Sequence, residues 1–180
     1  YDEKLQEIEI PSKVEKIGFS AFEECIGLVE ISLPDSIKEI ESYAFLMCVN
    51  LQKIKLPKYL EKINNETFRN CENLKNVIWP DKLKAVGDSA FASCYSLNTK
   101  IPEGIQKIGG GSFSETGIAE LTIPESVMEI DTRAFQGCKQ LKIVKMGSGI
   151  KTVKDSVFSS CDELEMVMLS NKTEMIGLGA

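Results

Sequence analysis

The sequence predicts an α/β repeat solenoid, and two periodic residue patterns together with one alternation point to this fold class. Before the recurring prolines, apolar and polar residues alternate, as in Ile31-Ser32-Leu33 before Pro34, which is typical of a half-buried strand. Phenylalanine recurs with gaps of 22 or 23 residues, at Phe22, Phe45, Phe68, Phe91, Phe113, Phe135 and Phe158. Proline keeps nearly the same period, at Pro11, Pro34, Pro57, Pro80, Pro102 and Pro124.

One repeat reads L-x-x-I-x-L-P-x-x-I-x-x-I-x-x-x-A-F-x-x-C-x-x, and it gives seven full copies from Leu5 and part of an eighth. The I-x-L stretch predicts a strand, which proline ends because it cannot donate to the ladder. In the second copy Ala44, Cys48 and Leu51 fall at i, i+4 and i+7, which predicts a short helical turn. A single coil cannot bury its apolar side, so we expect parallel strands of successive coils to stack.

The six cysteines share one slot of the repeat, and Thr116 takes that slot in the fifth copy. Stacking predicts a column of small, buried, structural thiols. A disulfide between neighbouring coils is the less favoured alternative, because bridged Cα atoms lie about 4.4–6.8 Å apart, close to the strand spacing. A metal site is disfavoured, since a straight column does not converge on one ion. Trp79 occupies an inward slot, which favours a core role over a ligand platform.

Composition argues against several function classes. The net charge is −6 and the pI is near 4.9, which disfavours a nucleic-acid partner. No apolar run approaches the roughly 18 residues of a membrane span, so no direct membrane insertion is expected. The chain has no histidine, which removes the usual general base, and Gly109-Gly110-Gly111 lacks the ending of a phosphate-binding loop. We therefore predict no enzyme, no cofactor and no metal.

The fifth copy, residues 97–117, departs from the pattern. It has one residue fewer in its strand, one fewer after Phe113, and no cysteine. Losing a strand residue reverses the side-chain direction, so we expect the sheet to kink or weaken there. The first and last copies lack polar caps, which predicts a single repeat domain over 1–180 that is a fragment of a longer chain. Open ends of this kind allow self-association.

Over residues 5 to 176 the repeat L-x-x-I-x-L-P-x-x-I-x-x-I-x-x-x-A-F-x-x-C resembles the 23-residue leucine-rich repeats of the BspA-like class. The resemblance implies a right-handed arc with a parallel β-sheet on its concave side and short helical turns on the other. It also implies a non-catalytic protein-binding or adhesion module of a bacterial cell-surface or secreted protein. The alternatives are a cytoplasmic scaffold or regulatory repeat protein, or a structural spacer stalk.

The outward strand positions are the candidate partner-binding residues, because they line the concave sheet. Lys53, Lys55 and Lys75 form a basic centre in an acidic chain, and Met166 and Met168 are apolar at positions that should be wet. The hypothesis is that lysines steer a protein partner and the apolar end anchors it. The alternative is ordinary surface charge, with the apolar end covered by further repeats. The predicted set is Glu30, Ser32, Lys53, Lys55, Lys75, Asn76, Ile78, Glu120, Thr122, Lys142, Lys145, Met166 and Met168.

Overall fold

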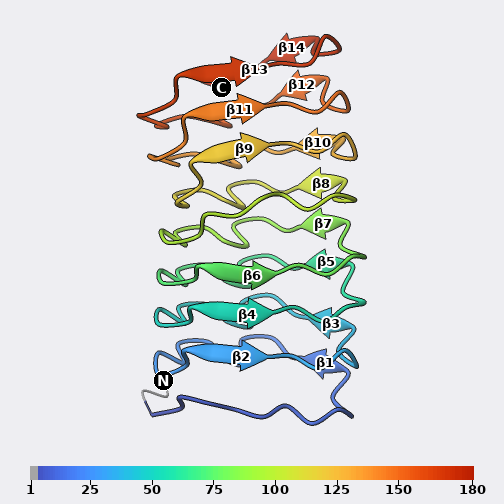
Figure 1. Ribbon diagram of the computed structural model, residues 1–180, viewed down its shortest axis with the longest axis vertical. Coiled ribbons are helices and arrows are strands. Elements are labelled where there is room, and N and C mark those ends of the chain that lie inside the picture. The colour runs from blue at the N-terminus through green and yellow to red at the C-terminus, as the bar shows by residue number, and fades with distance from the viewer. Residues whose placement is uncertain (1–3) are drawn as a thin grey trace.

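The chain winds into a column of coils in which short strands pair across successive coils, and every pair is parallel (Figure 1). The computed structural model describes residues 4–180. One set of strands has three residues each: β2 (Glu30–Ser32), β4 (Lys53–Lys55), β6 (Asn76–Ile78), β9 (Glu120–Thr122), β11 (Ile143–Lys145) and β13 (Met166–Met168). The predicted parallel stack of coils is confirmed.

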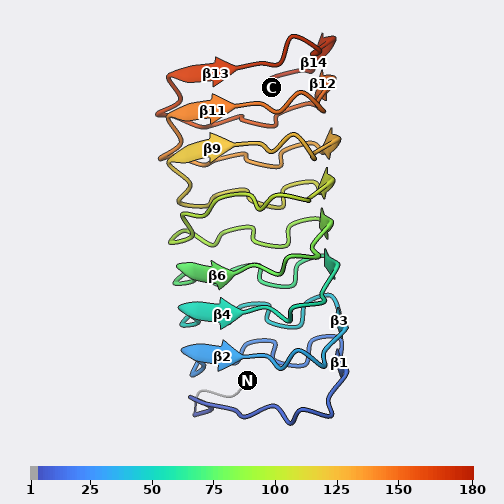
Figure 2. The same ribbon diagram turned by 45° about the vertical axis from the view of Figure 1, so that its right-hand side comes forward.

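A second set of strands has two residues each and lies on another side of the column, at the right of Figures 1 and 2. These strands are β1 (Lys16–Ile17), β3 (Glu39–Ile40), β5 (Lys62–Ile63), β7 (Ala85–Val86), β8 (Lys107–Ile108), β10 (Glu129–Ile130), β12 (Thr152–Val153) and β14 (Met175–Ile176). The sequence predicted one strand per coil and treated this stretch as a return path. That prediction was incomplete, because two residues are too few to show an alternation.

The register between coils equals one repeat. Ile31 lies opposite Ile54, which lies opposite Val77, so the same slot stacks on itself. Ile31 and Leu33 are buried while Ser32 is exposed, as the alternation predicts. Each coil therefore covers the apolar residues of the next.

The phenylalanines form a continuous stack through the core. Neighbouring rings are close to parallel, and their centroids lie 5.1 Å apart at Phe22–Phe45 and 5.9 Å apart at Phe135–Phe158. The five internal rings have no exposed surface: Phe45, Phe68, Phe91, Phe113 and Phe135. Offset aromatic pairs contribute beyond their burial, so this stack links the coils energetically as well as geometrically.

The predicted short helical turns are wrong. Residues 4–180 contain strands and turns but no helix, and hence no helix that could cross a membrane. Tyr43 and Met47 have left-handed backbone angles, with φ of 63° and 59°. Their segment directs backbone hydrogen bonds to the next coil, as when Phe45 N–H donates to the Thr67 carbonyl at 2.9 Å. Ala44, Cys48 and Leu51 still point inward, as predicted, so burial alone could not distinguish a helix from these turns.

The cysteine column is confirmed as structural. All six cysteines are buried, and no two of the described cysteines form a disulfide, which disagrees with the alternative of bridges between coils. The Cys48 thiol donates to the Phe22 carbonyl of the preceding coil at 3.0 Å, and Cys71 does the same to Phe45 at 3.1 Å. In the fifth coil Thr116 instead donates to Phe113 of its own coil at 2.9 Å.

The fifth coil interrupts the sheet of three-residue strands, as the missing strand residue predicts. Among the described residues this sheet is divided into β2-β4-β6 and β9-β11-β13, with no strand at 97–101. The other side of the column continues through the same coil, because β7 pairs with β8. Trp79 packs edge-on against Phe91, with centroids 5.4 Å apart, and donates to Thr99 at 3.0 Å. It therefore packs against the core, as expected.

Candidate partner-binding face

The three-residue strands carry their first and third side chains outward, so the same slots of successive coils form columns on the surface. Lys53 lies between Glu30 and Asn76 in one column, and Lys145 lies between Thr122 and Met168 in another. All the residues predicted as partner-binding are exposed and lie on or next to these strands. We call this surface the strand face; it comprises Glu30, Ser32, Lys53, Lys55, Lys75, Asn76, Ile78, Glu120, Thr122, Lys142, Lys145, Met166 and Met168.

The strand face is not one continuous site. The fifth coil, which lacks a three-residue strand, separates its N-terminal half, on β2, β4 and β6, from its C-terminal half, on β9, β11 and β13 (Figure 2). Within each half the backbone pairing holds the side chains in fixed register. The predicted residues are thus brought together as two groups.

The basic centre is weaker than the sequence suggested. Lys53 Nζ lies 2.8 Å from Glu30 Oε1, so one of the predicted steering lysines is paired with an acid from the neighbouring coil. No acidic group among the described residues pairs with Lys55, Lys75, Lys142 or Lys145. Four lysines are therefore available to a partner: Lys55 and Lys75 in the N-terminal half of the face, and Lys142 and Lys145 in the C-terminal half.

The apolar part of the face lies at the last strand. Met166 is 52% exposed and Met168 is 40% exposed on β13, which pairs with β11 alone among the described residues. Val167 and Leu169, which occupy inward slots, are also exposed because no coil covers them. The apolar character here thus comes from the end of the stack as well as from the outward methionines.

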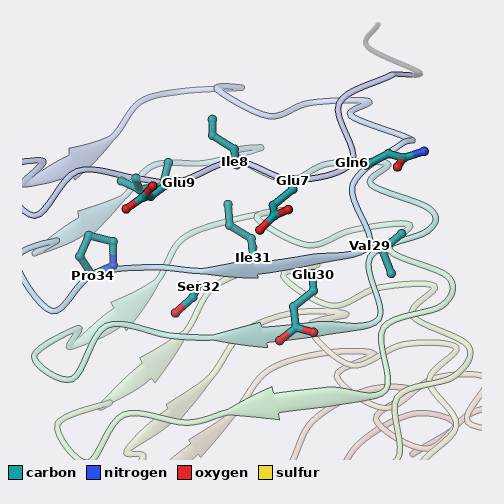
Figure 3. Close-up of a pocket in the computed structure, with 10 residues that line it drawn as sticks. Gln6, Glu7, Ile8, Glu9, Val29, Glu30, Ile31, Ser32 and Pro34 are labelled. Atoms are coloured by element: carbon teal, nitrogen blue, oxygen red, sulfur yellow. The ribbon is translucent and has the colours of Figure 1, made fainter.

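The N-terminal end of the strand face is acidic. Residues 6–10 run beside β2 and form no strand, and a hollow of about 790 Å³ lies between the two segments (Figure 3). Figure 3 shows Ile31 on the opposite side of its strand from Glu30 and Ser32. Glu7, Glu9 and Glu30 line this hollow, so the face changes from acidic to basic along the column.

The two-residue strands carry a charge pattern that the sequence pattern alone did not reveal. In one column Glu15, Lys38, Glu61 and Lys84 alternate in sign from coil to coil. Lys38 Nζ lies 3.3 Å from Glu15, and Lys84 Nζ lies 3.0 Å from Glu61. An adjacent column pairs Lys16 with Glu39 at 3.2 Å, with the signs reversed. Comparing charges one repeat apart would have revealed this compensated surface.

Two of the buried thiols, those of Cys71 and Cys94, have little nucleophilic character. Burial raises the pKa of the Cys71 and Cys94 thiols above their ordinary value, so both stay protonated at neutral pH. Among residues 4–180 no cluster of three or more histidine, cysteine or acidic side chains is arranged to hold a metal ion.

Comparisons with known proteins place the repeat in a family. A profile described as BspA type Leucine rich repeat region (6 copies) matches residues 1–100 and 98–180. The search of curated proteins found no match.

Solved structures show the same architecture. A leucine-rich repeat protein from Bacteroides ovatus is 32% identical, with a TM-score of 0.86 over 91% of this chain and 43% of that one. The T. pallidum leucine rich repeat protein is 26% identical, with a TM-score of 0.66 over 93% of this chain and 71% of that one.

The pneumococcal vaccine antigen PcpA is 18% identical, with a TM-score of 0.52 over 89% of this chain and 57% of that one, and shares the fold alone. The chain spans less than half the length of the Bacteroides ovatus protein. The sequence repeat, the buried columns of phenylalanine and cysteine, and the profile match over residues 1–180 agree. This chain belongs to the BspA-type leucine-rich repeat family.

Proposed function

We propose that this chain is a non-catalytic protein-binding module whose strand face contacts an extended surface of a partner protein. The carrying observation is the contrast between two sides of the column. Most lysines on or beside the two-residue strands pair with acids across coils, with Lys62 as an exception. On the strand face Lys53 is paired, whereas Lys55, Lys75, Lys142 and Lys145 have no acidic partner among the described residues. Uncompensated lysines in a chain of net charge −6 favour attraction of an acidic partner.

The two halves of the face have different roles in this proposal. The lysines speed encounter and set orientation, because exposed charges act mainly on association rate and specificity. Met166 and Met168 supply adaptable apolar contact at the C-terminal half, since methionine fits surfaces of varied shape. The acidic N-terminal end disfavours a partner that is acidic along its whole length.

We propose a cell-surface or secreted adhesion role as the setting. It is supported by what the BspA-type repeat implies and by the fold shared with a protein described as a vaccine antigen. A cytoplasmic scaffold would use the same face for a different partner, and a spacer stalk would leave the face without a partner.

The test is charge reversal on the strand face with a control of equal charge. The test variant changes Lys55, Lys75, Lys142 and Lys145 to Glu. The control variant changes four exposed lysines to Glu in the turns that follow the proline slot of the repeat: Lys13, Lys58, Lys82 and Lys172. Binding is measured by surface plasmon resonance against two protein panels, one of secreted host proteins and one of cytoplasmic proteins, at about 50 and 200 mM salt.

The proposal predicts a partner in one panel whose affinity falls at least tenfold in the test variant and little in the control. It also predicts weaker binding at the higher salt concentration, because exposed charges are screened. Equal losses in both variants would remove the strand face as the binding surface. No partner in either panel would favour the spacer stalk.

A further inference from the structure

The fifth coil leaves a notch among the turns that precede the three-residue strands, and no strand-face residue lines it. In the regular coils two residues separate the cysteine from the following leucine, as Val49 and Asn50 do between Cys48 and Leu51. In the fifth coil a single residue, Gly117, separates residues 116 and 118. The loops of the fourth and sixth coils therefore extend past the shortened fifth loop on both sides.

Gly117 is held tightly under the loop of the fourth coil. A Cβ atom built on it would lie 2.6 Å from the Tyr95 carbonyl oxygen, closer than real contacts allow. The short loop therefore requires glycine at this position, next to Thr116, which lines the notch. Thr116 is buried and donates to Phe113 at 2.9 Å, so this part of the lining is rigid.

A second glycine widens the notch. Gly137 has φ of 70° and occupies a left-handed slot in which other coils carry Met47, Asn70 and Ser93. A Cβ atom at position 137 would lie 3.1 Å from Glu115 Cγ, so a side chain there would occupy the opening. The missing loop residue and the missing side chain together leave a hollow of about 530 Å³, within the size range of small-molecule sites.

The lining has one aromatic ring and several neutral or balanced polar groups. Tyr95 is 52% exposed at one rim, and Glu115 already accepts a hydrogen bond from Ser93 Oγ at 2.8 Å. The amides of two glutamines each provide donors and acceptors. The remaining lining residues are Thr116, Gln136, Gly137, Lys139, Gln140 and Ser160.

This lining selects a neutral, polar ligand with one apolar face. The lining is mixed, so a purely apolar ligand would bury the Gln136 and Gln140 amides and the Glu115 carboxylate without partners, which costs free energy. The single carboxylate of Glu115 and the single ammonium of Lys139 balance, so neither sign of ligand charge is favoured. A pyranose ring meets both requirements, because its C–H face packs on an aromatic ring and its hydroxyls bond to amides and carboxylates.

We infer that the notch over Gly117 is a binding site for a single neutral pyranose residue, with Tyr95 as the stacking platform. Glu115, Gln136 and Gln140 supply hydrogen bonds to the hydroxyls. The site is separate from the strand face, so a protein partner and a saccharide can be held at different places on the column.

The inference is tested by NMR titration of ¹⁵N-labelled protein with methyl glycosides of glucose, galactose, mannose and N-acetylglucosamine. The expected result is a shift of the Gly117 and Gly137 amide signals by at least one glycoside, with a Kd of about 1 mM. The tetrapeptide Gly-Ser-Gly-Ser serves as a neutral polar probe of a different class. Shifts caused by the peptide and by none of the glycosides would overturn the inference, as would the absence of any shift.

Two variants test the geometry. Tyr95→Ala should weaken glycoside binding at least tenfold, while Tyr59→Ala, which removes another exposed tyrosine, should leave it unchanged. Gly137→Asn should abolish binding by filling the notch, and Asn70 in the same slot shows that the fold accepts asparagine there. Unchanged binding in Gly137→Asn, or an equal loss in both tyrosine variants, would refute the site.

Discussion

Replacing single rings of the phenylalanine stack by leucine should cost stability in proportion to the number of aromatic rings that each one touches. Phe22 packs on one ring, Phe45 packs on two, and Phe91 packs on three because Trp79 adds to its two stacked neighbours. An aromatic pair contributes about 0.5–1.5 kcal/mol beyond burial. The aromatic pairing energy removed is therefore about 0.5–1.5 kcal/mol for Phe22→Leu and three times that for Phe91→Leu.

The comparison of Phe45→Leu with Phe91→Leu isolates one ring pair, since both rings have no exposed surface. We expect Phe91→Leu to be less stable by about 1 kcal/mol, the contribution of the Trp79 edge contact. The measurement is urea unfolding followed by far-ultraviolet circular dichroism, which does not depend on the environment of Trp79. Equal losses of stability at Phe45 and Phe91, or a loss at Phe22 as large as at Phe91, would refute additive ring pairs.

Three further outcomes follow from the structure. Ser112→Ala should raise the free energy of unfolding by about 1 kcal/mol in urea titration, because the Ser112 hydroxyl is buried without a hydrogen-bond partner. A loss of stability would show that the hydroxyl does have a hydrogen-bond partner. Gly117→Ala should lower the thermal midpoint of unfolding by several degrees, because its Cβ would clash with a carbonyl oxygen of the preceding coil. The control Gly110→Ala should leave the midpoint unchanged, since no atom lies nearer than 3.4 Å to a Cβ there. Equal shifts in both variants would contradict the clash. Hydrogen bonds from two lysines, first from Lys154 and then from Lys107, lower the pKa of Glu129. The contribution of Glu129 to the free energy of unfolding is therefore complete above its ordinary pKa and is lost as the pH falls through the lowered pKa. The stability of Glu129→Gln should depend less on pH in acid unfolding, and the same dependence in both proteins would refute this.

The sequence predicted the stacking of coils because the residues that cause it are also the periodic ones. Each phenylalanine fills the slot below the next, so a 22- or 23-residue period in the sequence becomes a column in space. Burial of Ile31 and exposure of Ser32 followed from alternation for the same reason. Whether a repeat position is buried or exposed was therefore predictable, because it depends on the polarity of the side chain.

The conformation of the turns was not predictable from that pattern. A spacing of i, i+4 and i+7 shows which side chains point inward but not where the backbone hydrogen bonds go. The Phe45 N–H bonds to the next coil and not to its own, and Tyr43 and Met47 adopt left-handed angles that their residue types do not favour. Tertiary hydrogen bonding determined the conformation here.

The candidate site was predicted as a set of exposed positions but not in its electrostatics. The sequence placed Lys53 in a basic centre, whereas the register of one repeat brings Glu30 to 2.8 Å from it. The notch at Gly117 was also missed, because the shortened fifth copy was interpreted through its strand and not through its loop. Both features require comparing residues across coils.

The alternating columns on the two-residue strands bear on how a chain of near-identical units avoids misassembly. Coils of such a protein are almost interchangeable in their apolar slots, so one coil would pack nearly as well on the next coil but one as on its true neighbour. A skipped unit would set Glu15 against Glu61, or Lys38 against Lys84, and like charges directly opposite repel. The sign alternation over these four coils therefore favours nearest-neighbour assembly over arrangements in which the unit of Lys38 or of Glu61 is looped out.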